Sequence, residues 1–402
     1  MQRPEWLEVL EGGIDQVPGV TSGVGRAGLK REGPDLALLL SERLASAAMV
    51  ATTNRFRAAP VTVSQRRLSS GCAQAIVVNA GNANACTGEQ GLRDAEEMCA
   101  LAGEALGVPK EYVVVASTGV IGVALPMERI RAAIEAAGRA MGKHGQEATR
   151  AMMTTDKMVK QMAVRFPVGR GRVTLAGMTK GAGMIAPNMA TMLCFLFTDA
   201  VIGSEALSLA LRGAVELSFN SITIDGDTST NDMVVALANG MSGLDVGVGP
   251  GMERFELALR YLCVELAKMM VRDAEGATKT IEVLVKGAGS AREAKQAAMT
   301  VANSVLVKTA MFGADPNWGR IAAALGRCGV ELQPQRVSIA LCGAPVFTAG
   351  APVEFDAGAL RQAMSGKEIT VTIDLGSGNA EATVWTSDLS TDYVNFNSAY
   401  TT

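Results

Sequence analysis

Residues 178–199 join a glycine-rich turn to an apolar run, and this junction restricts the folds that are open to the chain. The turn contains two glycines and the pair Pro187-Asn188, which favours a change of chain direction. Met192 to Phe197 are then apolar without interruption. Because this run is too short to cross a bilayer, it must be buried in a protein core, and we predict a buried strand that begins at Thr191.

Thr191 lies where the turn meets the apolar run. Its hydroxyl can attack the carbonyl of Ala190 if the turn strains that peptide bond, and hydrolysis of the resulting ester would give Thr191 a free α-amine. The residue would then be a nucleophile that carries its own base. Threonine is also common in strands because it is β-branched, so the residues by themselves leave a purely structural role open.

Composition argues against several classes of function. The chain has 402 residues, more than one domain usually holds, so two lobes are expected. A net charge of −3, without basic runs or aromatic platforms, argues against nucleic acid as a partner. The seven cysteines are widely spaced and never form a Cys-x-x-Cys pair, which predicts free thiols in a reducing compartment. The charged N-terminus lacks the apolar stretch of a signal peptide, so we expect a cytoplasmic protein with no membrane association.

The titratable residues limit the chemistry further. The single histidine, His144, lies between two helical patterns, where a solvated loop position is expected. A histidine-based triad is therefore disfavoured, and an amine or a carboxylate must supply any general base. The acidic clusters at 225–227 and 273–275 contain the oxygens that hard metals prefer, but their spacing fits no standard metal loop. We interpret both clusters as caps and turns and expect no metal site.

Helical and strand patterns alternate along both halves of the chain, which predicts an α/β fold. Within this alternation we expect helices over 205–217 and 232–238 and a strand over 304–308. No fixed-period repeat is present, so a solenoid is excluded.

The segment from Lys180 to Leu193 resembles the self-cleaving, nucleophile-bearing segment of the ornithine acetyltransferase family, the glutamate N-acetyltransferases of arginine biosynthesis. Further segments that resemble the family cover essentially the whole chain: 53–61, 79–88, 117–122, 225–232, 273–279, 315–320 and 397–402. Ala274 and Phe396 depart from the residue types usual in the family, and neither departure touches the expected chemistry.

The resemblance implies a fold and a processing step. The implied fold is of the α/β (α+β) class, a layered sandwich of helices and sheets as in ornithine acetyltransferases and N-terminal nucleophile aminopeptidases. Self-cleavage between Ala190 and Thr191 would divide the chain into an alpha chain of residues 1–190 and a beta chain of residues 191–402. Two copies of each would assemble.

The resemblance also implies a reaction. The acetyl group of N-acetylornithine would pass to Thr191 as an ester and then to glutamate, giving ornithine and N-acetylglutamate. Thr118 and Gly119 match the positions that stabilise the oxyanion. The positions that match substrate-binding residues are Thr154, Lys180, Thr191, Glu275, Asn397 and Thr402. No cofactor is implied, and the sequence leaves open whether acetyl-coenzyme A is a second acyl donor.

Two other functions compete with this one. An N-terminal nucleophile aminopeptidase or amidase would pass the acyl group to water, whereas a catalytically silent binding protein would keep the chain uncut. Lys180 beside the expected nucleophile and the polar tail from Asn397 to Thr402 favour the transferase.

Overall fold

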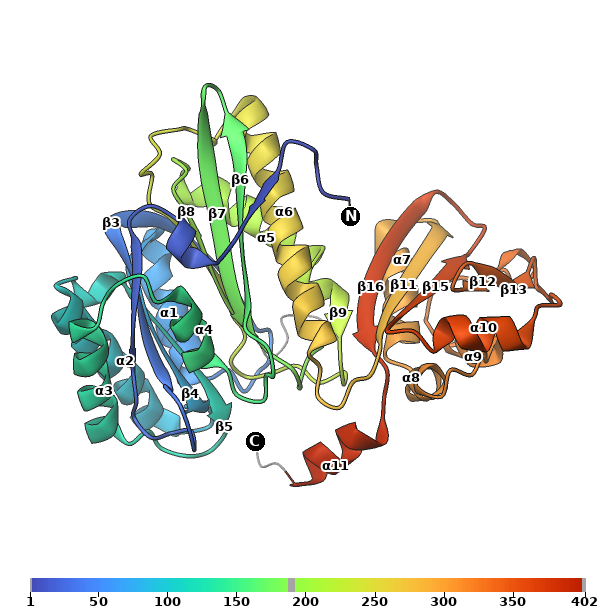
Figure 1. Ribbon diagram of the computed structural model, residues 1–402, viewed down its shortest axis with the longest axis horizontal. Coiled ribbons are helices and arrows are strands. Elements are labelled where there is room, and N and C mark those ends of the chain that lie inside the picture. The colour runs from blue at the N-terminus through green and yellow to red at the C-terminus, as the bar shows by residue number, and fades with distance from the viewer. Residues whose placement is uncertain (1, 187–191, 400–402) are drawn as a thin grey trace.

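Two β-sheets with helices packed on them form the part of the chain that the computed structural model describes, residues 2–186 and 192–399 (Figure 1). The predicted positions Ala190, Thr191 and Thr402 lie outside these described residues. The larger sheet has nine strands, in the order β1 (Glu8–Leu10), β6 (Lys160–Val168), β7 (Gly171–Lys180), β8 (Leu193–Thr198), β10 (Met233–Ala238), β3 (Leu36–Ala51), β4 (Cys72–Asn82) and β5 (Val113–Val120), with β2 (Val20–Gly25) also paired to β3.

Strand β3 belongs to both halves of this sheet. Its first residues pair with β4, its last residues pair with β10, and its register shifts between Leu40 and Ala45. One buried cluster contains alternate residues from both halves, among them Leu39 of β3 and Phe195 of β8, so the halves pack on one another. Because successive strand residues point to opposite faces, Leu38 and Leu196 pack in two other clusters with helices.

The helices complete a layered sandwich around the larger sheet. Helices α2 (Gly88–Leu106) and α3 (Met127–Arg139) cover the outer face of β4 and β5. Helices α5 (Ser204–Glu216) and α6 (Gly249–Arg272) cover the outer face of β6, β7, β8 and β10 (Figure 1). The predicted α/β layered sandwich is therefore confirmed.

The smaller sheet lies beside the larger one and has seven strands, in the order β14 (Ala351–Pro352), β13 (Ala344–Thr348), β12 (Ser338–Leu341), β15 (Glu368–Asp374), β11 (Thr280–Ala288), β16 (Ala380–Ser387) and β9 (Ile222–Thr223). Its core includes residues of α7 (Ala291–Ala302), α8 (Val305–Phe312), α9 (Trp318–Gly326) and α10 (Ala357–Met364). After β16 the chain turns back toward the larger sheet as α11 (Thr391–Ala399) (Figure 1).

Two sequence predictions of local structure are wrong. Within the predicted helix 232–238, Met233–Ala238 form strand β10, because this apolar segment lies between β8 and β3 and is buried on both faces. Within the predicted strand 304–308, Ser304 is the N-cap of helix α8 and Val305 is the first residue of that helix. The Ser304 hydroxyl accepts a hydrogen bond from the Val307 N–H, which is an N-cap interaction that the apolar pattern did not reveal.

Two further properties follow from the described residues. The seven cysteines all lie within them and are free thiols. No helix in residues 2–186 or 192–399 is long and apolar enough to span a bilayer.

Candidate active site

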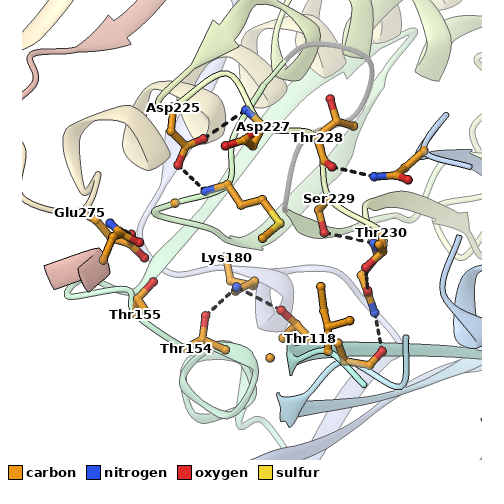
Figure 2. Close-up of a pocket in the computed structure, with 18 of the residues that line it drawn as sticks. Thr118, Thr154, Thr155, Lys180, Asp225, Asp227, Thr228, Ser229, Thr230 and Glu275 are labelled. Atoms are coloured by element: carbon orange, nitrogen blue, oxygen red, sulfur yellow. Dashed lines mark hydrogen bonds between the residues drawn. The ribbon is translucent and has the colours of Figure 1, made fainter. Parts of the chain in front are cut away.

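A cavity of about 370 Å³ lies where the strands of the larger sheet approach α11 (Figure 2). Its lining includes the six predicted site residues that fall within the described chain: Thr118, Gly119, Thr154, Lys180, Glu275 and Asn397. These residues come from segments up to 279 positions apart (397 − 118), and the fold brings them together. The volume is in the range of pockets that hold small ligands.

Lys180 is the last residue of β7, and its side chain joins two other predicted residues. The Lys180 Nζ donates hydrogen bonds to Thr154 Oγ1 at 2.8 Å and to Thr118 Oγ1 at 3.3 Å. Burial lowers the pKa of Lys180, while the neighbouring carboxylate of Asp156 raises it. Lys180 is thus a nearly buried amine that is oriented by two hydroxyl groups and balanced by a nearby acid.

Thr118 and Gly119 lie at the end of β5, where its parallel pairing with β4 becomes irregular. Gly119 has a φ of +130°, and a Cβ atom there would lie 2.3 Å from the backbone carbon of Gly81, so only glycine fits. The Thr118 hydroxyl accepts from Lys180, which leaves its own proton free to donate. A donor at this position can stabilise negative charge that develops on a bound carbonyl oxygen.

Glu275 and Asn397 form the opposite side of the cavity. The Asn397 amide donates to Glu275 Oε2 at 3.0 Å, and the Glu275 backbone N–H donates to the carbonyl of Ala182 at 2.9 Å. A Cβ atom at Gly183 would lie 2.3 Å from the Glu275 carboxylate, so the glycine lets the carboxylate approach the turn. The C-terminal helix therefore reaches the cavity through Asn397.

Asp225 holds the described part of the turn that follows Lys180. Its carboxylate accepts the N–H groups of Met184 at 2.6 Å and Ile185 at 2.7 Å, and it also accepts the Tyr393 hydroxyl at 3.2 Å. The interpretation of Asp225 as a turn residue is thus consistent with its contacts. The sequence did not indicate that Asp225 and Tyr393 also line the cavity.

Asp232 anchors the chain on the other side of residues 187–191. Its side chain is fully buried, and Oδ1 accepts the Met192 N–H at 2.8 Å. Its Oδ2 has no hydrogen-bond partner among the described residues. Burial raises the pKa of Asp232 well above its usual value, which favours a protonated carboxyl group next to the position that follows Thr191.

Comparison with known proteins identifies the family. The sequence model of the ArgJ family matches residues 21–402. An arginine biosynthesis bifunctional protein ArgJ from Symbiobacterium thermophilum is 49% identical and covers 98% of this chain and 100% of its own length. The corresponding protein of Geobacter sulfurreducens is 47% identical over 96% of this chain and 100% of its own length. The chain belongs to the ArgJ family.

Membership of the ArgJ family confirms the predicted resemblance and its function. The protein is an acetyltransferase of arginine biosynthesis, a glutamate N-acetyltransferase, and the aminopeptidase alternative is set aside. A crystal structure of the ArgJ protein from Bacillus halodurans is 39% identical, with a TM-score of 0.50. It covers 51% of this chain and 98% of the solved chain, so that solved chain is about half as long as this one.

The family positions do not include every group that shapes the site. Asp156, Asp225 and Asp232 contact backbone groups beside Lys180 or beside residues 187–191, and none was predicted as a site residue. Asp225 and Asp232 fall within a segment that resembles the family, and Asp156 comes two residues after Thr154. Their location in or near segments that resemble the family is the sequence signal that could have identified these three aspartates.

Proposed function

We propose that this ArgJ enzyme transfers the acetyl group of N-acetylornithine to glutamate through an ester on Thr191, which gives ornithine and N-acetylglutamate. The observation that carries the proposal is the single cavity that joins Lys180, Thr118 and Thr154 to Glu275 and Asn397. The cavity borders the turn before the 187–191 segment through Met184. On the other side, its lining residue Asn231 directly precedes Asp232, which accepts the Met192 N–H.

The first half-reaction attacks the acetyl carbonyl of the donor. The Thr191 Oγ forms a bond to the carbonyl carbon, and the freed α-amine of Thr191 takes the hydroxyl proton. The Thr118 hydroxyl and the Gly119 N–H stabilise the oxyanion. When the tetrahedral intermediate collapses, the bond from carbon to the ornithine nitrogen breaks, and that nitrogen takes the proton.

In the second half-reaction glutamate accepts the acetyl group, and Thr191 is the leaving group. The α-amine of glutamate attacks the acetyl-threonine ester, its proton passes to the α-amine of Thr191, and the Thr191 oxygen leaves and is reprotonated. Lys180 supplies a positive charge for a substrate carboxylate, and Glu275 supplies a negative charge for an ammonium group. Thr154, Asn397 and Thr402 complete the substrate-binding set.

Self-cleavage before Thr191 prepares the nucleophile and divides the chain into residues 1–190 and 191–402. Strands β8 and β10 lie between β7 and β3 in one sheet, so hydrogen bonds join the two products on both sides. The half-length solved chain of the Bacillus halodurans relative also supports cleavage. We further propose two copies of each product in the assembly and a cytoplasmic location.

Initial-rate kinetics test this function. Glutamate acetylation is measured with N-acetylornithine as donor, and again with acetyl-coenzyme A because the relatives are described as bifunctional. An acetyl-enzyme intermediate predicts parallel lines when donor and acceptor are varied together. Intersecting lines, or no transfer from N-acetylornithine by a cleaved sample, would contradict the proposal.

A further inference from the structure

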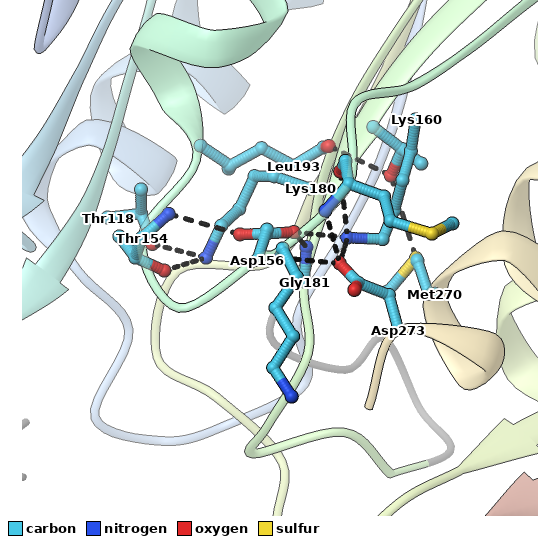
Figure 3. Close-up of polar contacts among 12 residues, drawn as sticks. Thr118, Thr154, Asp156, Lys160, Lys180, Gly181, Leu193, Met270 and Asp273 are labelled. Carbon is cyan, nitrogen blue, oxygen red and sulfur yellow. Dashed lines mark hydrogen bonds and ion pairs between the residues drawn. The ribbon is translucent and has the colours of Figure 1, made fainter. Parts of the chain in front are cut away.

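A buried network of charges lies beside Lys180, which lines the cavity (Figure 3). At its centre is Asp156, whose side chain is fully buried. One carboxylate oxygen accepts the Lys160 Nζ at 2.6 Å and the Gly181 N–H at 2.7 Å, and the other accepts the Thr154 N–H at 3.0 Å. Asp156 thus binds the backbone of one site residue, Thr154, and of the residue that follows another, Lys180.

We propose that Asp156 is a positioning residue for acetyl transfer, which holds Thr154 and Gly181 around Lys180 and balances the positive charge of Lys180. This inference rests on the proposed role of Lys180 as the cation that binds a substrate carboxylate. Asp156 does not line the cavity itself, so it acts through its neighbours and not by touching the substrate.

The charge of Asp156 favours the protonated form of Lys180. Burial alone raises the pKa of Asp156, but the charges of Lys180 and Lys160 and the Gly181 hydrogen bond outweigh burial and lower it to about 2. Asp156 is therefore ionised throughout the working pH range. Without its charge, burial and the cation of Lys160 would both favour a neutral Lys180.

Other charged groups also face Lys180, and they do not replace Asp156. Glu275 lies across the cavity and raises the pKa of Lys180, but less than Asp156 does. Asp232 also raises the pKa of Lys180, but less than Asp156 and Glu275 do, and its own burial favours its neutral form. Lys30 is a further cation in this region: burial lowers its pKa, Asp156 raises it, and the charge of Lys180 lowers it.

Asp273 provides a matched control within the same network. It follows α6 and binds the same amine of Lys160 as Asp156 does, and its side chain is only 2% exposed. Its carboxylate also accepts the N–H groups of Lys157 and Met158, at 2.9 Å and 3.2 Å. It is not among the charges that shift the pKa of Lys180, so its loss removes an equally buried carboxylate without changing the balance at Lys180.

The pH dependence of kcat/KM for N-acetylornithine tests the inference on cleaved, purified enzyme. If binding needs the Lys180 cation, activity falls as pH rises through the Lys180 pKa. Asp156→Asn should move this alkaline limb to lower pH by about one unit, the size of shift that a neighbouring charge produces. Asp273→Asn should leave the limb at its wild-type position, and Asp156→Glu, which keeps the charge, should restore it.

A second variant covers the case in which Asp156→Asn does not fold. Lys160→Gln removes a like charge from the surroundings of Lys180, so it should move the alkaline limb to higher pH. The inference about Asp156 would be overturned if the alkaline limb of Asp156→Asn stayed at the wild-type pH, or if that of Lys160→Gln did not move to higher pH. Either result would leave the proposed function of the enzyme standing. A wild-type enzyme without acetyl transfer would instead overturn the proposed function on which this inference rests.

Discussion

A hydrogen bond from Lys180 orients the hydroxyl group of Thr118 in the cavity. Because Lys180 can only donate, the Thr118 hydroxyl must accept from it and can direct its own proton into the cavity. The buried amine therefore orients the hydroxyl that is proposed to stabilise the oxyanion.

Replacing this hydroxyl should lower turnover and leave the fold intact. Thr118→Val keeps the side-chain shape but removes the donor, so we expect kcat to fall on the order of a hundredfold. Thr118→Ser keeps the donor and should retain turnover within a few-fold. Thermal unfolding of both variants controls for stability, and a folded Thr118→Val enzyme with wild-type kcat would exclude Thr118 from the oxyanion site.

A second prediction concerns the contribution of Asp232 to the stability of the fold and how this contribution changes with pH. Its folded pKa lies above the unfolded value, so its contribution to stability is full below the unfolded pKa and is lost as pH rises through the folded pKa. Asp232→Asn is neutral at every pH and can still accept the Met192 N–H. We expect this variant to unfold a few degrees above the wild type at alkaline pH, with a smaller gain at acidic pH. An equal change at both pH values would contradict a protonated Asp232.

Helix α11 connects the C-terminal end of the chain to the cavity. Chain ends are ordinarily frayed, but α11 contacts the cavity through the Tyr393 and Asn397 side chains. Its placement makes α11 a wall of the proposed substrate site.

Deleting residues 397–402 should weaken the donor complex without preventing cleavage, because cleavage uses groups near Thr191. The loss of hydrogen bonds to charged substrate groups predicts an increase in KM for N-acetylornithine of about tenfold or more. Gel analysis checks that the truncated chain is still cleaved. An unchanged KM in a cleaved sample would remove Asn397 and Thr402 from the site.

The elements also show how far the sequence could be interpreted. Strand β8 could be predicted because its apolar run permits only burial, whereas β10 could not, because its short apolar run has no clear period. The site residues were found through resemblance to a family and not through periodicity. The role of Asp156 could not be predicted, because it depends on Gly181, 25 positions away, and only the fold brings the two together.

At the scale of the whole molecule, the interleaved sheet explains how a divided chain could remain one protein. Strands that follow Thr191 lie between strands that precede it, so separation of the two products would require the central sheet to unfold. The proposed cleavage would therefore release the α-amine of Thr191 without separating these paired strands.

The most direct test of the central role of Thr191 is the intact mass of the enzyme after mixing with N-acetylornithine in the absence of glutamate. Self-cleavage followed by acetylation of Thr191 predicts chains of 190 and 212 residues (402 − 190), the second heavier by one acetyl group that fragmentation places on Thr191. Added glutamate should remove this acetyl group, and Thr191→Ala should remain one uncut, unmodified chain. An active wild-type enzyme that stays uncut, or that carries no acetyl group on Thr191 under these conditions, would contradict the account.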